Sequence, residues 1–233
     1  TAHLPYGDKS PETLHRYIRP IVWALRAVPV KAIVIACNTA SAVAAQVVRQ
    51  EAGPLPVYEV IAPAVAQAVA QAPGGRIGVI GTKTTVASGV YRQQLLAANP
   101  QAQVLQKATP LLVPLIEEGW EKRPVARMVL EAYLSDSGFA SLEALILGCT
   151  HYPHLQADIQ EALSRLWGHP IAVINSAEAV AARVAEGLAQ RGLLAPAGST
   201  ASYTYQLTDA NPTFAETAAR FLGHAIALQG IQL

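Results

Sequence analysis

The chain contains two cysteines, Cys37 and Cys149, and they occupy the same place in two similar stretches. Residues 32–39 read AIVIACNT and residues 144–151 read ALILGCTH, so each cysteine follows a short aliphatic run and precedes polar residues. Cysteine is often a small buried hydrophobe, but the repetition of so scarce a residue favours a functional role. A C-x-x-C redox motif is absent, and nothing else in the sequence favours a disulfide.

Two thiols in equivalent positions suit the inversion of a carbon atom that carries one hydrogen. One group must remove a proton from one face of the carbon, and a second group must deliver a proton to the opposite face. A free thiol has a pKa of about 8.5, so only a small part of it is thiolate at neutral pH. We expect the helix predicted after each cysteine to lower that pKa towards the range useful for acid–base catalysis.

The aliphatic run before each cysteine is typical of a strand buried on both faces of a parallel sheet. Strands alternate with helices along the whole chain, which predicts a doubly wound α/β architecture. The expected strands are 31–36, 56–60, 76–81, 103–107, 142–148 and short ones near 171 and 203; the expected helices are 11–27, 40–51, from 63 onward, 82–98, around 115, 124–134, 154–167, 177–191 and 213–228. Ligands of such folds bind at the carboxyl ends of strands, where both cysteines are predicted to lie.

Composition excludes several classes of protein. Apolar residues make up 52% of the chain, which excludes intrinsic disorder, and 17 basic against 16 acidic residues argue against nucleic-acid binding. The longest uncharged run, 32–48, is too short and polar to span a membrane, and no signal peptide is visible, so we expect a cytoplasmic protein. The chain begins with Thr1 and its only methionine is Met128, so we expect the natural N-terminus to lie upstream.

Residues 35–40 (IACNTA) and 148–153 (GCTHYP) resemble the two signature motifs of the glutamate racemases, cofactor-independent members of the aspartate/glutamate racemase family. Further similar segments are 5–10, 81–91, 113–119, 176–180 and 221–223. The family's first strand and its Asp-Ser-Gly motif would lie upstream of Thr1. A polypeptide that truly lacked them would be expected to fold poorly and to racemise little.

The resemblance implies roles for individual residues. Cys37 and Cys149 would be the two acid–base groups, and His151 would assist Cys149. Substrate contacts are implied for Pro5, Tyr6, Gly7, Asn38, Thr39, Thr82, Thr85, Glu117 and Thr150.

Some of these residues also have simpler interpretations. Thr82 and Thr85 could equally cap a helix, and Glu117 could be a solvated charge. His151 and His154 are three residues apart, but Pro153 separates them and no third ligand is clustered there, so we expect no metal site. We expect His154 to be a surface or capping residue.

The implied fold has two pseudosymmetric α/β domains, 1–61 plus 175–233 and 62–174, each with a mostly parallel sheet flanked by helices. The site would lie in the cleft between them. The implied function is interconversion of L- and D-glutamate without a cofactor, supplying D-glutamate for peptidoglycan.

Other functions stay open: a racemase for aspartate or a related acid, a non-catalytic binding protein on a truncated racemase fold, and a hydrolase or decarboxylase with one essential thiol. A homodimer and regulation by a cell-wall precursor also stay open as partner predictions.

Overall fold

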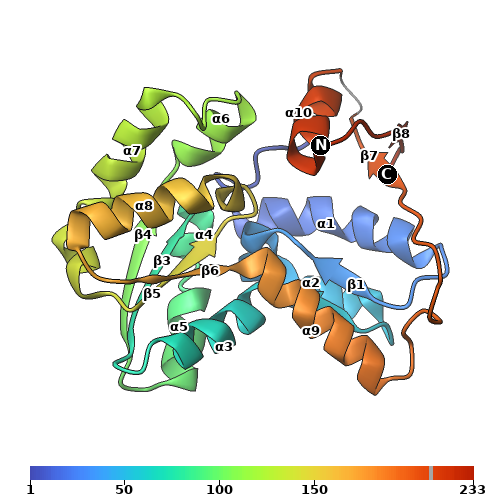
Figure 1. Ribbon diagram of the computed structural model, residues 1–233. Helices are drawn as coiled ribbons and strands as arrows, with labels where there is room; N and C mark the ends of the chain where they lie inside the picture. Colours follow the sequence, from blue (N-terminus) through green and yellow to red (C-terminus); the bar gives the residue numbers. More distant parts are fainter. Residues whose placement is uncertain (210–211) are drawn as a thin grey trace.

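The computed structural model describes residues 1–209 and 212–233 and has an α/β architecture in which every described strand pairing is parallel (Figure 1). The strands are β1 (Ile33–Ile35), β2 (Val57–Glu59), β3 (Arg76–Gly81), β4 (Gln103–Ala108), β5 (Ala144–Gly148), β6 (Ala172–Asn175), β7 (Tyr205–Leu207) and β8 (Leu228–Gly230). The α-helices are α1 (Pro11–Arg26), α2 (Asn38–Ala52), α3 (Ile61–Gln71), α4 (Lys83–Ala87), α5 (Val90–Ala98), α6 (Leu112–Glu117), α7 (Pro124–Leu134), α8 (Gln156–Trp167), α9 (Ser176–Gln190) and α10 (Pro212–Leu222). Two 3₁₀ helices, η1 (Ser137–Ser141) and η2 (Tyr152–Leu155), flank β5.

The larger sheet has the strand order β4-β3-β5-β6. All five residues of β5 are buried because helices cover both faces: Leu145 and Leu147 join one hydrophobic cluster, while Ala144 and Ile146 join the other. This explains the uninterrupted aliphatic run seen in the sequence. At the strand end, a Cβ on Gly148 would lie 2.7 Å from the carbonyl oxygen of Ile80, so only glycine fits before Cys149.

The smaller sheet, β1 and β2, packs beneath α1 and α2. Ser10 caps α1 by accepting a hydrogen bond from the backbone N–H of Thr13, and Pro11 opens the helix, as the sequence predicts. Leu14 and Ile18 of α1 are buried in a cluster with residues of β1 and α2. This packing fixes the direction of β1 and therefore the position of Cys37, which follows it.

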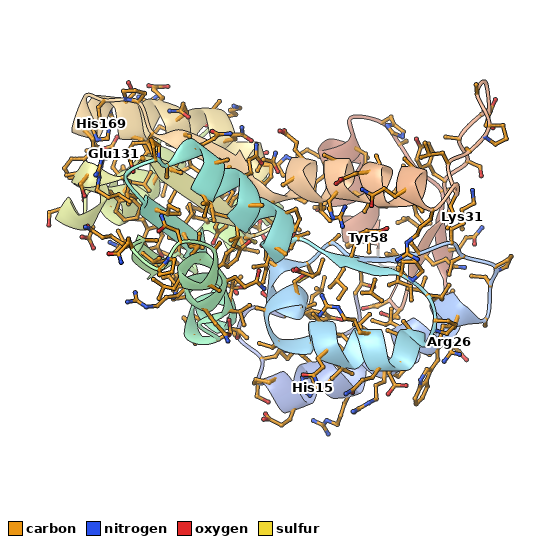
Figure 2. All side chains as sticks on the ribbon, turned by 90° about the horizontal axis from the view of Figure 1, so that it is seen from below. His15, Arg26, Lys31, Tyr58, Glu131 and His169 are labelled. Carbon is orange, nitrogen blue, oxygen red and sulfur yellow. The ribbon has the colours of Figure 1, made fainter. Side chains whose placement is uncertain are left out.

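Helix α3 carries the chain from β2 to β3 of the larger sheet, and α9 carries it from β6 to β7, which pairs with β8 in a third sheet. The two helices pack against each other (Figure 1). Helix α9 also contacts β2, where Tyr58 lies beside it in the view from below (Figure 2). A Cβ on Gly187 would lie 2.1 Å from the hydroxyl of Tyr58, so this contact needs glycine. The domain limits near residues 61 and 175 stay predictions.

Two expected helices have different limits in the structure. The expected helix 82–98 is two helices, α4 and α5, because the backbone turns at Gly89 with a φ of 68°. The expected helix 213–228 ends at Leu222, before Gly223 with a φ of 76°, and Leu228 begins strand β8. Glycine adopts positive φ at no steric cost, so each breaks the helical repeat.

Candidate active site

Cys37 lies at the junction between β1 and α2. It is the N-cap of α2, and its Sγ accepts a hydrogen bond from the backbone N–H of Ala40 at 3.4 Å. Burial raises the pKa of the Cys37 thiol, although the backbone N–H groups of Ala40 and Thr39 and the Thr39 hydroxyl act in the opposite direction. Thus the helix N-terminus does favour the thiolate, but desolvation is the larger effect.

Cys149 directly follows β5, and only 5% of its surface is exposed. Burial is the main reason that the pKa of Cys149 rises to about 12, and the charge on Cys37 raises it further. The two sulfurs are therefore within electrostatic reach of each other. Thr150, directly after Cys149, is exposed.

The expectation that a helix lowers the pKa of both cysteines is wrong. After Cys149 the chain first enters a short 3₁₀ helix, η2, and the predicted α-helix begins later, as α8. At both cysteines burial outweighs the backbone hydrogen bonds. A sequence pattern reports which helix follows a residue, but it does not report how deeply distant segments bury that residue.

His151 links Cys149 to Glu117. Its Nδ1 lies 3.7 Å from the Sγ of Cys149, and its Nε2 lies 3.1 Å from Oε1 of Glu117. Glu117 is thus paired with a histidine, which the interpretation as a solvated charge did not foresee. His154, expected as a surface or capping residue, is half-buried in the last turn of η2, and its ring packs on Phe221 at 4.1 Å between ring centroids.

Three threonine hydroxyls form a cluster beside Cys37, here called the hydroxyl triangle. Thr39 lies 3.0 Å from Thr82 and 3.2 Å from Thr85, and Thr82 lies 2.9 Å from Thr85, all measured between Oγ1 atoms. Thr82 is also the N-cap of α4, so the capping role that the sequence left open is confirmed, while its contact with substrate stays a prediction. The triangle joins the start of α2 to the carboxyl end of β3.

The first loop, residues 5–7, lies next to Cys37 and the hydroxyl triangle. The carbonyl of Gly7 accepts a hydrogen bond from the backbone N–H of Thr84 at 3.0 Å. Tyr6 and Cys37 pack against the same hydrophobic cluster, and burial raises the pKa of Tyr6, as does the charge on Cys37. Pro5 is exposed at the outer edge of the loop.

Asn38 is held within the protein by residues that the predicted site omitted. The hydroxyl of Tyr91 donates to Oδ1 of Asn38 at 2.5 Å, and Nδ2 of Asn38 donates to Oγ of Ser176 at 3.2 Å. Ser176 in turn donates to the carbonyl of Leu147 at 3.1 Å. These buried hydrogen bonds connect the residue after Cys37 to β5, the strand that directly precedes Cys149. Tyr91 and Ser176 lie in segments that resemble the family, but only the fold reveals their contact.

Three general properties hold for residues 1–209 and 212–233. Both cysteines are free thiols. No group of three or more His, Cys, Asp or Glu side chains is arranged to hold a metal ion. No helix in this part of the chain combines the length and the apolar character needed to cross a membrane.

Residues 7–184, which contain both cysteines and the side chains around them, match the family described as Asp/Glu/Hydantoin racemase. The chain belongs to this racemase family. Among curated relatives, the glutamate racemase of Geobacter metallireducens is 41% identical over 96% of this chain and 81% of its own length. The glutamate racemase of Syntrophus aciditrophicus is 39% identical over 100% of this chain and 85% of its own. The resemblance inferred from the two cysteine motifs is confirmed.

Solved structures agree with this assignment to the racemase family. Glutamate racemase isoform RacE1 from Bacillus anthracis has a TM-score of 0.90 and 31% identity, and the match covers 100% of this chain and 85% of that chain. Glutamate racemase from Francisella tularensis, solved in complex with D-glutamate, has a TM-score of 0.88 and 31% identity, covering 100% and 84%. The predicted α/β fold class with two domains is therefore confirmed.

Proposed function

We propose that this chain interconverts L-glutamate and D-glutamate by moving the α-proton between the thiols of Cys37 and Cys149. Curated relatives about 40% identical over nearly the whole chain are glutamate racemases, which supports this substrate. The observation that carries the mechanism is the coupling of the two sulfurs: the charge on Cys37 raises the pKa of Cys149. When one sulfur is thiolate, the other is favoured as thiol, and a two-base inversion needs this pair of states.

In the proposed reaction, the thiolate on one side removes the α-proton, and the electrons of the C–H bond remain on the carbon as a planar carbanion. The thiol on the opposite side then donates its proton to the other face. The configuration is inverted, and the two sulfurs have exchanged protonation states. Each enantiomer thus uses a different cysteine as its base, and the atoms balance without a cofactor.

Burial disfavours either thiolate in the protein alone, so the substrate must help to form it. The ammonium group of an amino acid lies on the reacting carbon, and a positive charge beside a thiol lowers the pKa of that thiol. On one side, His151 would stabilise the Cys149 thiolate through Nδ1 while Glu117 accepts a hydrogen bond from Nε2. On the other, the start of α2 would stabilise the Cys37 thiolate.

The remaining site residues are proposed to hold the substrate. The hydroxyl triangle would donate to its carboxylates, and the first loop would cover the site from outside. Both polar atoms of the Asn38 side chain are already hydrogen-bonded, to Tyr91 and Ser176. We therefore propose that Asn38 contacts the substrate through its backbone N–H, at the first position of α2. Thr150 would bind next to Cys149, where its exposed side chain is available.

The product D-glutamate would supply peptidoglycan synthesis, as expected for the family. Two catalytic thiols must remain reduced, which fits the proposed cytoplasmic location. The homodimer and the cell-wall precursor as regulator stay predictions of the resemblance.

Circular dichroism of purified protein incubated with L- or D-glutamate tests this function. Both enantiomers should converge on the racemate, and Cys37→Ser and Cys149→Ser should each lose roughly 10²–10⁴-fold in rate, the usual contribution of a general acid or base. Met128→Leu, at a side chain 68% exposed on α7, serves as the control. Full activity in either cysteine variant would refute the two-base assignment. Racemisation of aspartate in place of glutamate would refute the substrate, and binding without racemisation would favour a non-catalytic protein.

A further inference from the structure

Helix α10 lies late in the chain, yet its last turn contacts the half of the site that contains Cys149. Phe221 packs against the hydrophobic cluster on one face of the larger sheet. Arg220, beside it, donates hydrogen bonds to the end of α6. Neither residue has a part in the proton transfer proposed above.

Phe221 fixes the ring of His151 from the side. The two ring centroids are 5.8 Å apart with an interplanar angle of 87°, an edge-to-face contact, while His154 packs on the same phenyl ring. The two nitrogens of His151 face Cys149 and Glu117, so the orientation of this ring decides whether both contacts exist together.

Arg220 fixes the segment that carries Glu117. One guanidinium nitrogen, Nη2, donates to the carbonyl oxygens of Ile116 and Glu117 at 2.7 and 2.8 Å, and so caps the C-terminus of α6. Just beyond this end, Gly119 has a φ of 68°, and a Cβ there would lie 2.8 Å from Nη1 of Arg220. The positive φ at this turn favours glycine, because other residues adopt it only with strain.

We propose that the end of α10 is the positioning element for the Cys149 side of the reaction: Phe221 orients His151, and Arg220 holds Glu117 within reach of that histidine. This inference rests on the proposed function. It predicts that a change in α10 slows proton transfer at Cys149 while transfer at Cys37 is unaffected.

Overall rates cannot separate the two sulfurs, because enantiomers have equal free energy and kcat/KM must fall equally in both directions. Primary isotope effects can separate them. If transfer at Cys149 becomes the slow step, the isotope effect on kcat/KM rises for the α-deuterated enantiomer that Cys149 deprotonates. It falls for the other enantiomer, since transfer at Cys37 is then no longer limiting.

The experiment compares Phe221→Ala and Phe221→Leu with Glu117→Gln, which weakens the same relay directly. The control is Leu222→Ala, at the next residue of α10, whose side chain is 44% exposed. We expect kcat/KM to fall about tenfold or more in Phe221→Ala, because small misplacement of catalytic groups is costly. The isotope effect on kcat/KM should rise for one enantiomer and fall for the other, and this split should have the same direction as in Glu117→Gln. Phe221→Leu, which keeps an apolar side chain, should show the same split to a smaller extent, and Leu222→Ala should match the wild type.

Equal isotope effects for both enantiomers in the Phe221 variants would overturn the inference, and so would the same split in Leu222→Ala. If Phe221→Ala does not fold, Phe221→Leu and Arg220→Lys decide the question by the same measurement. Absence of racemisation in the wild-type protein would instead overturn the proposed function, so the two failures are distinguishable.

Discussion

The raised pKa of Cys149 predicts a specific loss of stability in alkaline solution. The pKa of this thiol rises from about 8.5 to 9 in an unfolded chain to about 12 in the folded protein, so between these pH values the unfolded chain releases the thiol proton while the folded protein retains it. Stability from this group is therefore complete below about pH 9 and declines as the pH rises towards 12. At pH 10 the unfolded thiol is mostly ionised, and the linkage relation gives a loss on the order of 1 kcal/mol in the free energy of unfolding.

Urea denaturation at pH 8 and pH 10, in the presence of a reductant, measures this loss. Burial also raises the pKa of Tyr91 and Tyr152, so the wild-type protein loses further stability from these groups. Comparison with Cys149→Ser cancels their contribution because a serine hydroxyl does not titrate in this range. We expect the variant to lose less than the wild type between the two pH values, by an amount on the order of 1 kcal/mol. An identical alkaline loss in both proteins would refute the argument that burial controls this thiol.

Two substitutions test the contacts around Cys37. Tyr91→Phe leaves the buried Oδ1 of Asn38 without its hydrogen-bond donor, so it should lower the free energy of unfolding by about 1–3 kcal/mol and also slow racemisation. The control is Tyr133→Phe, whose hydroxyl makes an exposed hydrogen bond and whose loss should change stability by less than about 0.5 kcal/mol in urea denaturation. Equal losses in the two variants would contradict a stabilising role of the contact between Tyr91 and Asn38. Gly7→Ala places a Cβ 2.8 Å from the Cβ of Thr82 and must displace the first loop. This substitution should lower kcat/KM, measured by circular dichroism, about tenfold, and a tenfold loss corresponds to about 1.4 kcal/mol of transition-state stabilisation. An unchanged kcat/KM would show that this loop does not touch the site.

Much of the fold follows from local sequence patterns. The aliphatic run of β5 predicts a doubly buried strand, and Ser10 with Pro11 predicts the start of α1, because each pattern acts through residues a few positions away. The limits of α5 and α10 were predicted less well. Their glycines, Gly89 and Gly223, adopt positive φ, which glycine allows but does not require.

The sequence by itself determined the chemistry: two equivalent cysteines, the strands that deliver them and the family to which they belong. Only the tertiary structure decided how those thiols behave. Desolvation depends on every segment that packs around a sulfur, so burial raises the pKa of Cys37 and Cys149 where the local helix signal predicted the reverse. The contacts of Tyr91 with Asn38 and of Phe221 with His151 join residues more than 50 positions apart, and no spacing rule reaches across such distances.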